Sequence, residues 1–366
     1  NVGVTGRHYT NFVMVGQLAF NNKKTGDFYW KDEAINHDIG YLSHLGIDEK
    51  HLVFLEDVWV GGGNYGPCIE YFADGLELGN CVFMQYEVLP NGGSRELSTK
   101  VIDMGAGLER LAWITHASPI SYDLVFGPAV DVLQKKAGIT VDKKLFLEYA
   151  KLSGSLNTDE VEDVGKEKAA IAAKLGMSVE QMDATFNPLH AVYACADHLK
   201  TILFTSKDGM LPSNSGGGYN LRMILRRTFG FDEEYSMGID YAGVLEAHAR
   251  HLKQLFPKLQ EGVPTAIAIV EEERKKYSAG KEKGRGKVEN ILSRGKAIGV
   301  EELKKLYESD GIPIELVAEI AKEKGVKVHM PENFYSLMRK EDSTGEPVEK
   351  PIDVEGHEKT KTLFYE

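Results

Sequence analysis

The pattern of apolar and polar positions divides the chain into two parts. Up to about residue 118, short apolar runs are separated by Gly, Asn and Pro, which is typical of strands joined by turns. Examples are His51–Leu55, Cys68–Phe72 and Cys81–Tyr86. We therefore predict that the first part is rich in strands.

From Pro119 onward, apolar positions recur at helical spacing. One such series is formed by Leu221, Ile224, Leu225 and Thr228. The change of pattern predicts a domain boundary between residues 118 and 119. We expect a mostly helical domain over residues 119–345 and a polar linker over residues 346–366.

A strongly charged stretch, residues 271–305, also has a helical pattern with few apolar positions. Glycines at 280, 284 and 286 would each weaken a helix by about 1 kcal/mol. Two interpretations stay open, a solvated helix with a hinge at the glycines and an arm that faces RNA.

The overall charge limits the possible partners. With 43 Lys and Arg against 55 Asp and Glu, the net charge is −12. Such a protein would not coat nucleic acid indiscriminately, and DNA is not an expected partner. Any RNA binding would need a local basic surface.

Three cysteines, Cys68, Cys81 and Cys195, are far apart and lack the spacing of metal ligands. This predicts neither a disulfide scaffold nor a zinc site, and it favours a reducing, cytoplasmic setting. No apolar run reaches the length of a membrane span, so no membrane partner is expected.

The segment Val101–Arg110 has the pattern of a strand end, a glycine turn and a helix start. Gly105 and Gly107 let the backbone approach a ligand closely, and a helix start offers free N–H groups to phosphate. The planar guanidinium of Arg110 suits a phosphate oxygen. The alternative is a plain strand–helix turn with Arg110 in a surface ion pair.

Two other segments could meet a ligand. Four glycines follow Trp59 within residues 61–66, so this loop could pack over a small molecule with the indole as a wall. Near the start, Arg7 and His8 precede an apolar strand that could present Phe12 and Met14 to a flat base. The alternatives are an exposed connecting loop and a basic turn before a core strand.

A candidate basic surface lies on the helix predicted over residues 220–227. Its apolar stripe leaves Arg222 and Arg226 one turn apart on another face, with Arg227 adjacent. Clustered arginines on one face suit a phosphate backbone. They could equally pair with Asp or Glu.

Taken together, these segments resemble the archaeal-type alanyl-tRNA synthetases, which are class II aminoacyl-tRNA synthetases. The matching segments follow the family's order and cover essentially the whole chain. They are Asn1–His8, Phe12 with Met14, the Trp59 segment ending at Cys68, Val82–Gln85, Asp103–Arg110, Ala196–His198, Pro212–Asn214 and Asn333–Tyr335.

The resemblance implies an α+β fold. It has a class II antiparallel sheet with flanking helices over residues 1–118, followed by a mostly α-helical tRNA-recognition domain. The implied reaction activates L-alanine with ATP and Mg²⁺ to alanyl-adenylate and transfers alanine to tRNA(Ala). Positioning and charge stabilisation carry such a reaction. We expect a monomer.

The resemblance also implies roles for single residues. Arg7, Asp103 and Arg110 would form the catalytic set, with Arg110 at the γ-phosphate and Asp103 at the ammonium group of alanine. ATP would be bound by His8, Phe12, Met14, Gly105, Gly107 and Arg110, and alanine by Trp59, Asn80, Val82 and Asp103. Asn214 and Glu308 would read the wobble G·U pair of the tRNA. By the charge argument alone, Arg222, Arg226 and Arg227 would contact its backbone.

The sequence departs from the family at Val13, where Glu is usual, and at Glu308, where Asp is common. We also expect that the upstream motif-1 helix, the first motif-2 strand and the editing domain lie outside this chain. We therefore predict low activity alone, no proofreading and no zinc. Two rival functions are a non-catalytic tRNA-binding module and a ligase for another small amino acid.

Overall fold

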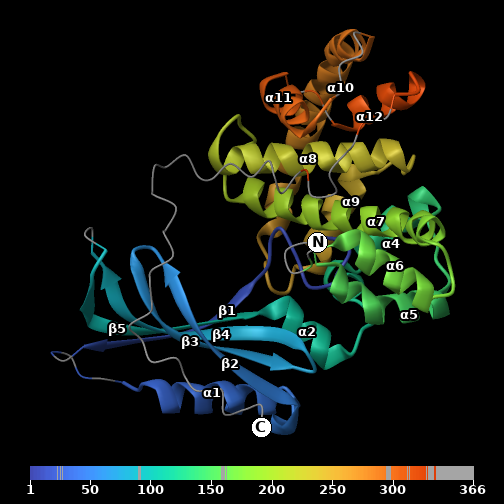
Figure 1. Cartoon of the computed structure of the whole chain (residues 1–366). Helices are drawn as coiled ribbons and strands as arrows, with labels where there is room; N and C mark the ends of the chain where they lie inside the picture. The colour runs from blue at the N-terminus through green and yellow to red at the C-terminus, as the bar shows by residue number, and fades with distance from the viewer. Residues whose placement is uncertain are drawn as a thin grey trace.

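The computed structural model describes residues 1–22, 24, 26, 28–89, 92–157, 161, 163–293, 298–310, 312, 314–326, 328 and 334, without the side chains of residues 308–310 and 315. In this part of the chain, five strands form one antiparallel sheet, seen in the lower half of Figure 1. The strands are β1 (Met14–Asn22), β2 (Leu52–Gly61), β3 (Asn64–Ala73), β4 (Leu76–Val88) and β5 (Ser94–Gly107), in the spatial order β1-β5-β4-β3-β2.

The two faces of the sheet have different surroundings because side chains alternate along each strand. Ile102, Met104 and Ala106 of β5 are buried in the core between the sheet and helix α1 (Lys31–His44). The residues between them, Asp103 and Gly105, belong to the opposite face. Figure 1 shows α1 beneath the sheet and most of the other helices beyond its other side.

The predicted strand-rich part contains α1, which the sequence reading did not identify. Its buried residues Ala34, Asp38 and Leu42 are four positions apart and form a narrow stripe. Because one of the three is an aspartate, this stripe gives only a weak hydrophobic pattern.

Most of the remaining chain is helical, as predicted. The helices are α2 (Leu108–His116), α3 (Ser121–Phe126), α4 (Pro128–Ala137), α5 (Lys143–Ser153), α6 (Val164–Lys174), α7 (Val179–Lys207), α8 (Gly216–Glu234), α9 (Tyr241–His251), α10 (Val263–Ser293), α11 (Val300–Asp310) and α12 (Ile314–Glu323), with short 3₁₀ turns η1 (Glu49–His51), η2 (Gly154–Leu156) and η3 (Leu259–Gly262). A capping box formed by Ser178 and Gln181 starts α7. From Ala191 to Leu203 this helix is buried on every side, so it forms the centre of the helical core.

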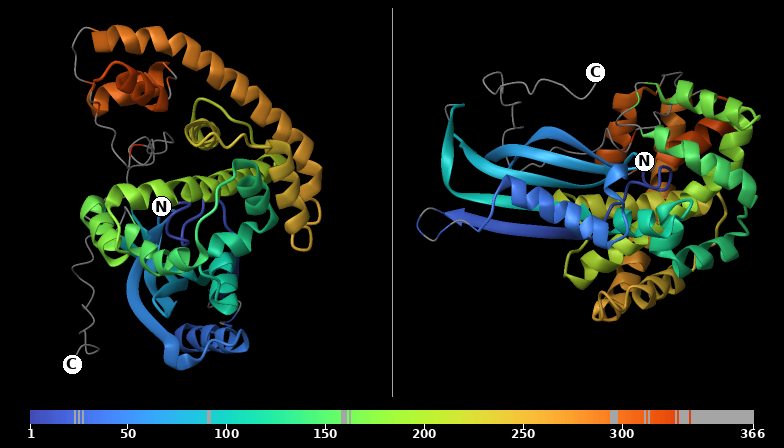
Figure 2. Two further views of the ribbon diagram at one scale, coloured as in Figure 1. Left: turned by 90° about the vertical axis from the view of Figure 1, so that its right-hand side faces the viewer. Right: turned by 90° about the horizontal axis from the view of Figure 1, so that it is seen from below.

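The charged stretch forms the second half of α10 and then α11. Figure 2 (left) shows α10 as a long helix that extends outward to α11 and α12. It continues through the three glycines without a break, so the predicted hinge is wrong. Gly284 is buried, and a Cβ there would lie 2.8 Å from the side chain of Ile312. Contact with RNA stays a prediction.

The first thirteen residues lie with the helices, outside the sheet. The N–H of Gly3 donates to the hydroxyl of Tyr122 at 3.0 Å, and a Cβ on Gly3 would lie 2.5 Å from the carbonyl oxygen of His190 in α7. Contacts therefore cross the boundary predicted after residue 118, which stays a prediction. The predicted linker over residues 346–366 lies outside the described residues, as do Asn333 and Tyr335.

Within the described residues, no helix is both long enough and apolar enough to cross a membrane.

Candidate functional site

A cavity of about 620 Å³ lies on the face of the sheet opposite α1. The strand register builds its floor, because Val82 of β4 pairs with Asp103 of β5, and Asp103 pairs with Leu18 of β1. Its lining residues are Arg7, His8, Tyr9, Phe12, Met14, Gly16, Leu18, Trp59, Glu77, Leu78, Gly79, Asn80, Val82, Asp103, Met104, Gly105, Gly107, Glu109 and Arg110.

The structure brings together in this one cavity all the residues that the sequence assigned to ATP, alanine or catalysis. They come from the N-terminal segment, from β1, β2, β4 and β5, and from the start of α2. Asp103 and Arg110, in particular, contribute to the same cavity. The ligands that Asp103 and Arg110 bind stay a prediction.

Arg110 is fixed in place at one side of the cavity. Its Nη1 donates to the Glu77 carboxylate at 2.8 Å and to the Glu77 carbonyl at 3.0 Å, while Nε and Nη2 donate to the carbonyl of Arg7 at 3.4 and 3.3 Å. The side chain keeps 23% of its surface exposed. A preoriented, partly exposed guanidinium suits a phosphate group.

The sequence reading missed Glu77. It stands outside the recognised segments and reaches Arg110 only because β4 lies beside β5 in the sheet. Nothing in the local sequence marks it as a partner of Arg110.

Asn80 provides an unsatisfied acceptor in the cavity wall. Its Nδ2 lies 3.6 Å from the Sγ of Cys68, but its buried Oδ1 has no hydrogen-bond partner among the described residues. A buried acceptor without a partner costs free energy, and a donor from a ligand would offset this cost. Burial also raises the pKa of the Cys68 thiol to about 11, so this thiol stays protonated and is a poor nucleophile.

Trp59 stands at the end of β2, and the expected loop after it is a tight hairpin. Gly62 and Gly63, with φ of 60° and 77°, form the two-residue turn between β2 and β3. Gly61 lies under the indole, and a Cβ there would approach the ring to 2.1 Å. None of the glycines at 61, 62, 63 and 66 lines the cavity, so a loop packed over a ligand is not supported, although Trp59 itself lines the cavity and is 40% exposed.

Phe12 and Met14 provide an apolar, exposed wall. A Cβ on Gly105 would lie 2.6 Å from the Sδ of Met14, so a side chain at 105 would displace this wall. His8 contacts the hydroxyl of Thr5 at 2.6 Å through Nδ1. The guanidinium of Arg7 lies against η2, since a Cβ on Gly154 would be 3.0 Å from its Nη2.

The residues predicted to contact tRNA lie away from this cavity, on the helical part. Asn214 is exposed in the turn before α8. Arg226 lies over the ring of Tyr307 at 6.0 Å, and Arg227 over the ring of Phe231 at 5.3 Å. Glu308 lies in α11, but its side chain falls outside the described part of the chain.

Arg222 needs a correction. Its guanidinium donates to both carboxylate oxygens of Glu273 in α10, at 2.8 and 3.0 Å, and also to the Oδ1 of Asn214. The side chain is only 15% exposed and that of Glu273 only 4%. Because this charge is already neutralised inside the protein, the prediction of a direct phosphate contact by Arg222 is not supported.

Comparison with known proteins assigns the whole chain to one family. The family model described as "tRNA synthetases class II (A)" matches residues 1–363. An alanine–tRNA ligase of Methanocella arvoryzae is 39% identical over 368 residues, and that of Methanothermobacter thermautotrophicus is 36% identical over 372 residues. Each match covers 100% of this chain and 41% of the relative. The alanine–tRNA ligase of Cenarchaeum symbiosum is 39% identical, and its match covers 100% of this chain and 40% of the relative.

The chain therefore spans about two fifths of the length of these relatives. The antiparallel sheet with flanking helices agrees with the α+β fold expected for class II synthetases. Sheet, cavity and family match lead to one conclusion: the chain belongs to the class II tRNA synthetases.

Proposed function

We propose that this chain is the alanine-activating and tRNA-recognising part of an alanine–tRNA ligase. The single observation that carries the proposal is the pairing of opposite charges in one cavity, with the Asp103 carboxylate and the Arg110 guanidinium both in its lining. A carboxylate suits the ammonium group of an amino acid, and a guanidinium suits a triphosphate. The names of the relatives favour alanine as the amino acid.

The proposed reaction has two steps. The carboxylate oxygen of alanine attacks the α-phosphorus of ATP, the bond to the β-phosphate oxygen breaks, and pyrophosphate leaves. A ribose hydroxyl at the end of tRNA(Ala) then attacks the alanyl carbonyl, loses its proton and releases AMP. Neither step needs a protein nucleophile, so orientation and charge stabilisation by the cavity supply the catalysis.

At the amino-acid end, Asp103 accepts from the ammonium group, and the free Oδ1 of Asn80 accepts from the same group. The Trp59 indole and Val82 limit the size of the side chain. Such a pocket cannot reject glycine or serine strongly, because one methylene or hydroxyl changes the binding free energy by only about 1–3 kcal/mol.

At the nucleotide end, Phe12 and Met14 contact adenine, and Arg110 binds the terminal phosphate with the N–H groups at the start of α2. Class II synthetases in general use ATP with Mg²⁺. No group of three metal-ligating side chains occurs among the residues the structure describes. A magnesium ion that enters on the triphosphate would find an oxygen ligand in the Glu77 carboxylate beside Arg110.

On the helical part, Asn214, which is exposed, and Glu308 of α11 read the acceptor stem of tRNA(Ala), and Arg226 and Arg227 approach its backbone. Arg222 orients Asn214 through its Oδ1, which leaves the Asn214 amide N–H groups to donate.

Alanine-dependent exchange between ATP and labelled pyrophosphate tests this function. It is measured on this chain and on a longer protein that also contains the parts of its relatives outside the matched region. Exchange with alanine in either protein supports the proposal. No exchange in both, together with tight binding of tRNA(Ala), would instead identify a tRNA-binding module. Exchange only with another small amino acid would identify a different ligase.

A further inference from the structure

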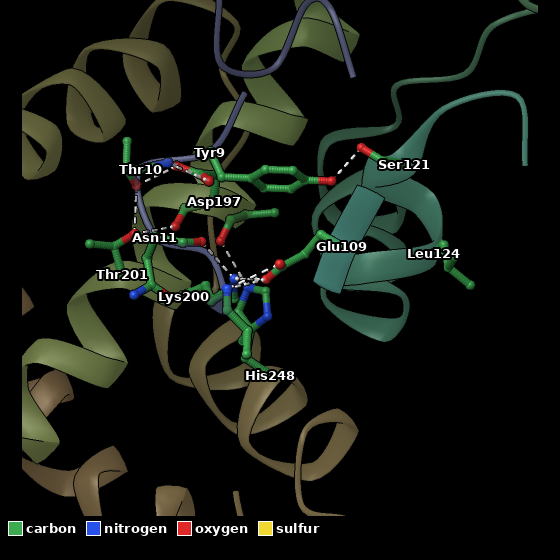
Figure 3. Close-up of polar contacts among 12 residues, drawn as sticks. Tyr9, Thr10, Asn11, Glu109, Ser121, Leu124, Asp197, Lys200, Thr201 and His248 are labelled. Atoms are coloured by element: carbon green, nitrogen blue, oxygen red, sulfur yellow. Dashed lines mark hydrogen bonds and ion pairs between the residues drawn. The ribbon is translucent and has the colours of Figure 1, made fainter. Parts of the chain in front are cut away.

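The segment from Tyr9 to Val13 has no regular secondary structure, yet side chains from distant elements bind its backbone. Figure 3 shows this segment between α7, which carries Asp197 and Lys200, and α2, which carries Glu109. The N–H of Thr10 donates to both oxygens of Asp197, at 3.0 and 3.2 Å. The Thr10 hydroxyl donates to the same carboxylate at 2.5 Å.

Lys200 binds the next residue of the segment. Its Nζ donates to the carbonyl of Asn11 at 2.8 Å and lies 3.2 Å from the Glu109 carboxylate. The Glu109 carboxylate in turn accepts from the N–H of Val13 at 3.1 and 3.0 Å. Both peptide groups that flank Phe12 are therefore fixed by this buried ion pair.

All three charged side chains are almost fully buried. Asp197 is 0% exposed, Lys200 1% and Glu109 6%. Burying charges is costly, and apolar residues of similar size often serve stability as well or better. Apolar residues, however, would leave the polar backbone groups of Thr10, Asn11 and Val13 without partners. The charges thus serve the conformation of this segment.

The segment carries Phe12 into the cavity, and Glu109 immediately precedes Arg110 in the first turn of α2. The Nζ of Lys200 thus contacts both the backbone at the base-binding wall, at the Asn11 carbonyl, and the helix at the phosphate side, at the Glu109 carboxylate. His248 of α9 supports α7 at this point, because its Nε2 donates to the carbonyl of Ala196 at 2.9 Å. Figure 3 shows His248 beside Lys200.

We propose that Lys200 and Asp197, on the central helix of the helical part, are positioning residues for the nucleotide site on the sheet. They hold Phe12 at the adenine by fixing the backbone on both sides of it, and they do not touch ATP. This inference rests on the proposed function, because it takes the cavity to bind ATP. It makes nucleotide affinity depend on a helix that lines no part of the cavity.

The test compares ATP with tripolyphosphate, which has no base, by titration calorimetry on the full chain. Lys200→Met keeps the apolar stem but removes the charge. We expect ATP to bind about tenfold or more weakly, because Phe12 is displaced, while tripolyphosphate affinity changes much less. Lys200→Arg should recover part of the loss. Lys207→Met is the matched control, since Lys207 lies on the same helix and pairs with Glu261 at 3.2 Å.

The double variant Lys200→Met with Glu109→Gln distinguishes the proposed positioning role from a purely structural one. It removes the unpaired buried charge that Lys200→Met leaves on Glu109, so its melting temperature should recover part of the loss, while ATP affinity stays low. ATP affinity that follows melting temperature across all variants would overturn the proposal. So would parent-like ATP binding by folded Lys200→Met.

If the parent chain binds no ATP, the proposed function fails and this role at the nucleotide site falls with it. Hydrogen exchange then still tests the contacts themselves. Faster exchange of the Thr10 and Val13 amides in Lys200→Met, with no change in Lys207→Met, would support the fixing of the segment. Unchanged exchange would refute it.

Discussion

At the scale of residues, the polar groups of the cavity are held in place by the protein itself. Arg110 is oriented by Glu77 and by the carbonyl of Arg7, so binding a phosphate does not require ordering a free side chain. Asn80 differs, because its buried Oδ1 lacks a partner among the described residues. The cavity therefore has one preformed cationic group and one acceptor that a ligand can satisfy.

Arg110→Lys should weaken ATP binding, although the positive charge is retained. A lysine cannot donate to Glu77, to the Arg7 carbonyl and to a phosphate in one plane. The loss of a charged hydrogen bond is worth about 1.5–3 kcal/mol, so we expect ATP affinity to fall by roughly tenfold or more. Titration with ATP measures this affinity. Arg95→Lys, in an exposed pair with Glu87, is the control and should change nothing.

Asp38 should make stability depend on pH. Burial raises the pKa of this carboxyl from 3.8 to about 7, although a hydrogen bond with Cys81 acts in the opposite direction. The folded protein therefore keeps a proton that the unfolded chain releases, and the contribution of Asp38 to stability falls as the pH rises from about 4 to 7.

Asp38→Asn removes this titration. Relative to the parent, the variant should gain more than about 1 kcal/mol in unfolding free energy between pH 5 and pH 8. Urea denaturation at both pH values measures the difference. Asp32→Asn, on the exposed first turn of α1, should show no comparable change with pH. Equal effects of Asp38→Asn at both pH values would contradict the argument.

Much of the candidate site could be predicted from the sequence. Asp103 and Arg110 stand in one short segment with a distinctive glycine pattern. Glu77, Glu109 and Lys200 received no role, because their partners are set by tertiary structure. Lys200 and Glu109 are 91 residues apart and meet only where α7 lies beside α2.

At the scale of elements, periodicity identifies the apolar side of a helix but gives no information about what faces the other side. For α8 the predicted apolar stripe is confirmed, as Leu221, Leu225 and Thr228 are buried and Ile224 is partly buried. The polar side was expected to face a phosphate backbone. At Arg222 it meets Glu273 of α10 instead, because two helices pack there.

Two glycines of α10 should respond oppositely to alanine. A Cβ on Gly286 would meet no atom within 4 Å apart from the adjacent helix backbone, so Gly286→Ala should stabilise the helix by up to about 1 kcal/mol. Gly284→Ala gains the same propensity but places its Cβ 2.8 Å from buried Ile312. We expect a net loss there, because the packing against Ile312, which precedes α12, must shift. Thermal unfolding of both variants compares them, and equal stabilisation would contradict this packing argument.

At the scale of the whole molecule, the sequence separates a strand-rich part from a helical part, and the structure agrees with this division. The sequence, however, could not show that the first thirteen residues pack against α3 and α7, because such contacts leave no periodic pattern. The spatial order of the strands also could not be predicted from local sequence alone. The cavity and the helical core thus depend on each other through a segment with no regular structure.

A fragment of residues 1–118 therefore makes a sharp test. It contains every residue that lines the cavity but lacks Asp197 and Lys200. We expect its ATP affinity to be about tenfold or more below that of the full chain, since the segment around Phe12 loses its anchors. Calorimetric titration checks this, and a fragment with full affinity would contradict it.

The position of Trp59 gives the protein a built-in optical reporter. Of the three tryptophans, all of them in the described part of the chain, only Trp59 lines the cavity, and this residue is 40% exposed. A substrate that displaces water from this ring should shift its fluorescence emission to shorter wavelength. With Trp30 and Trp113 replaced by phenylalanine, a single chromophore would follow the filling of the cavity in real time, without any label.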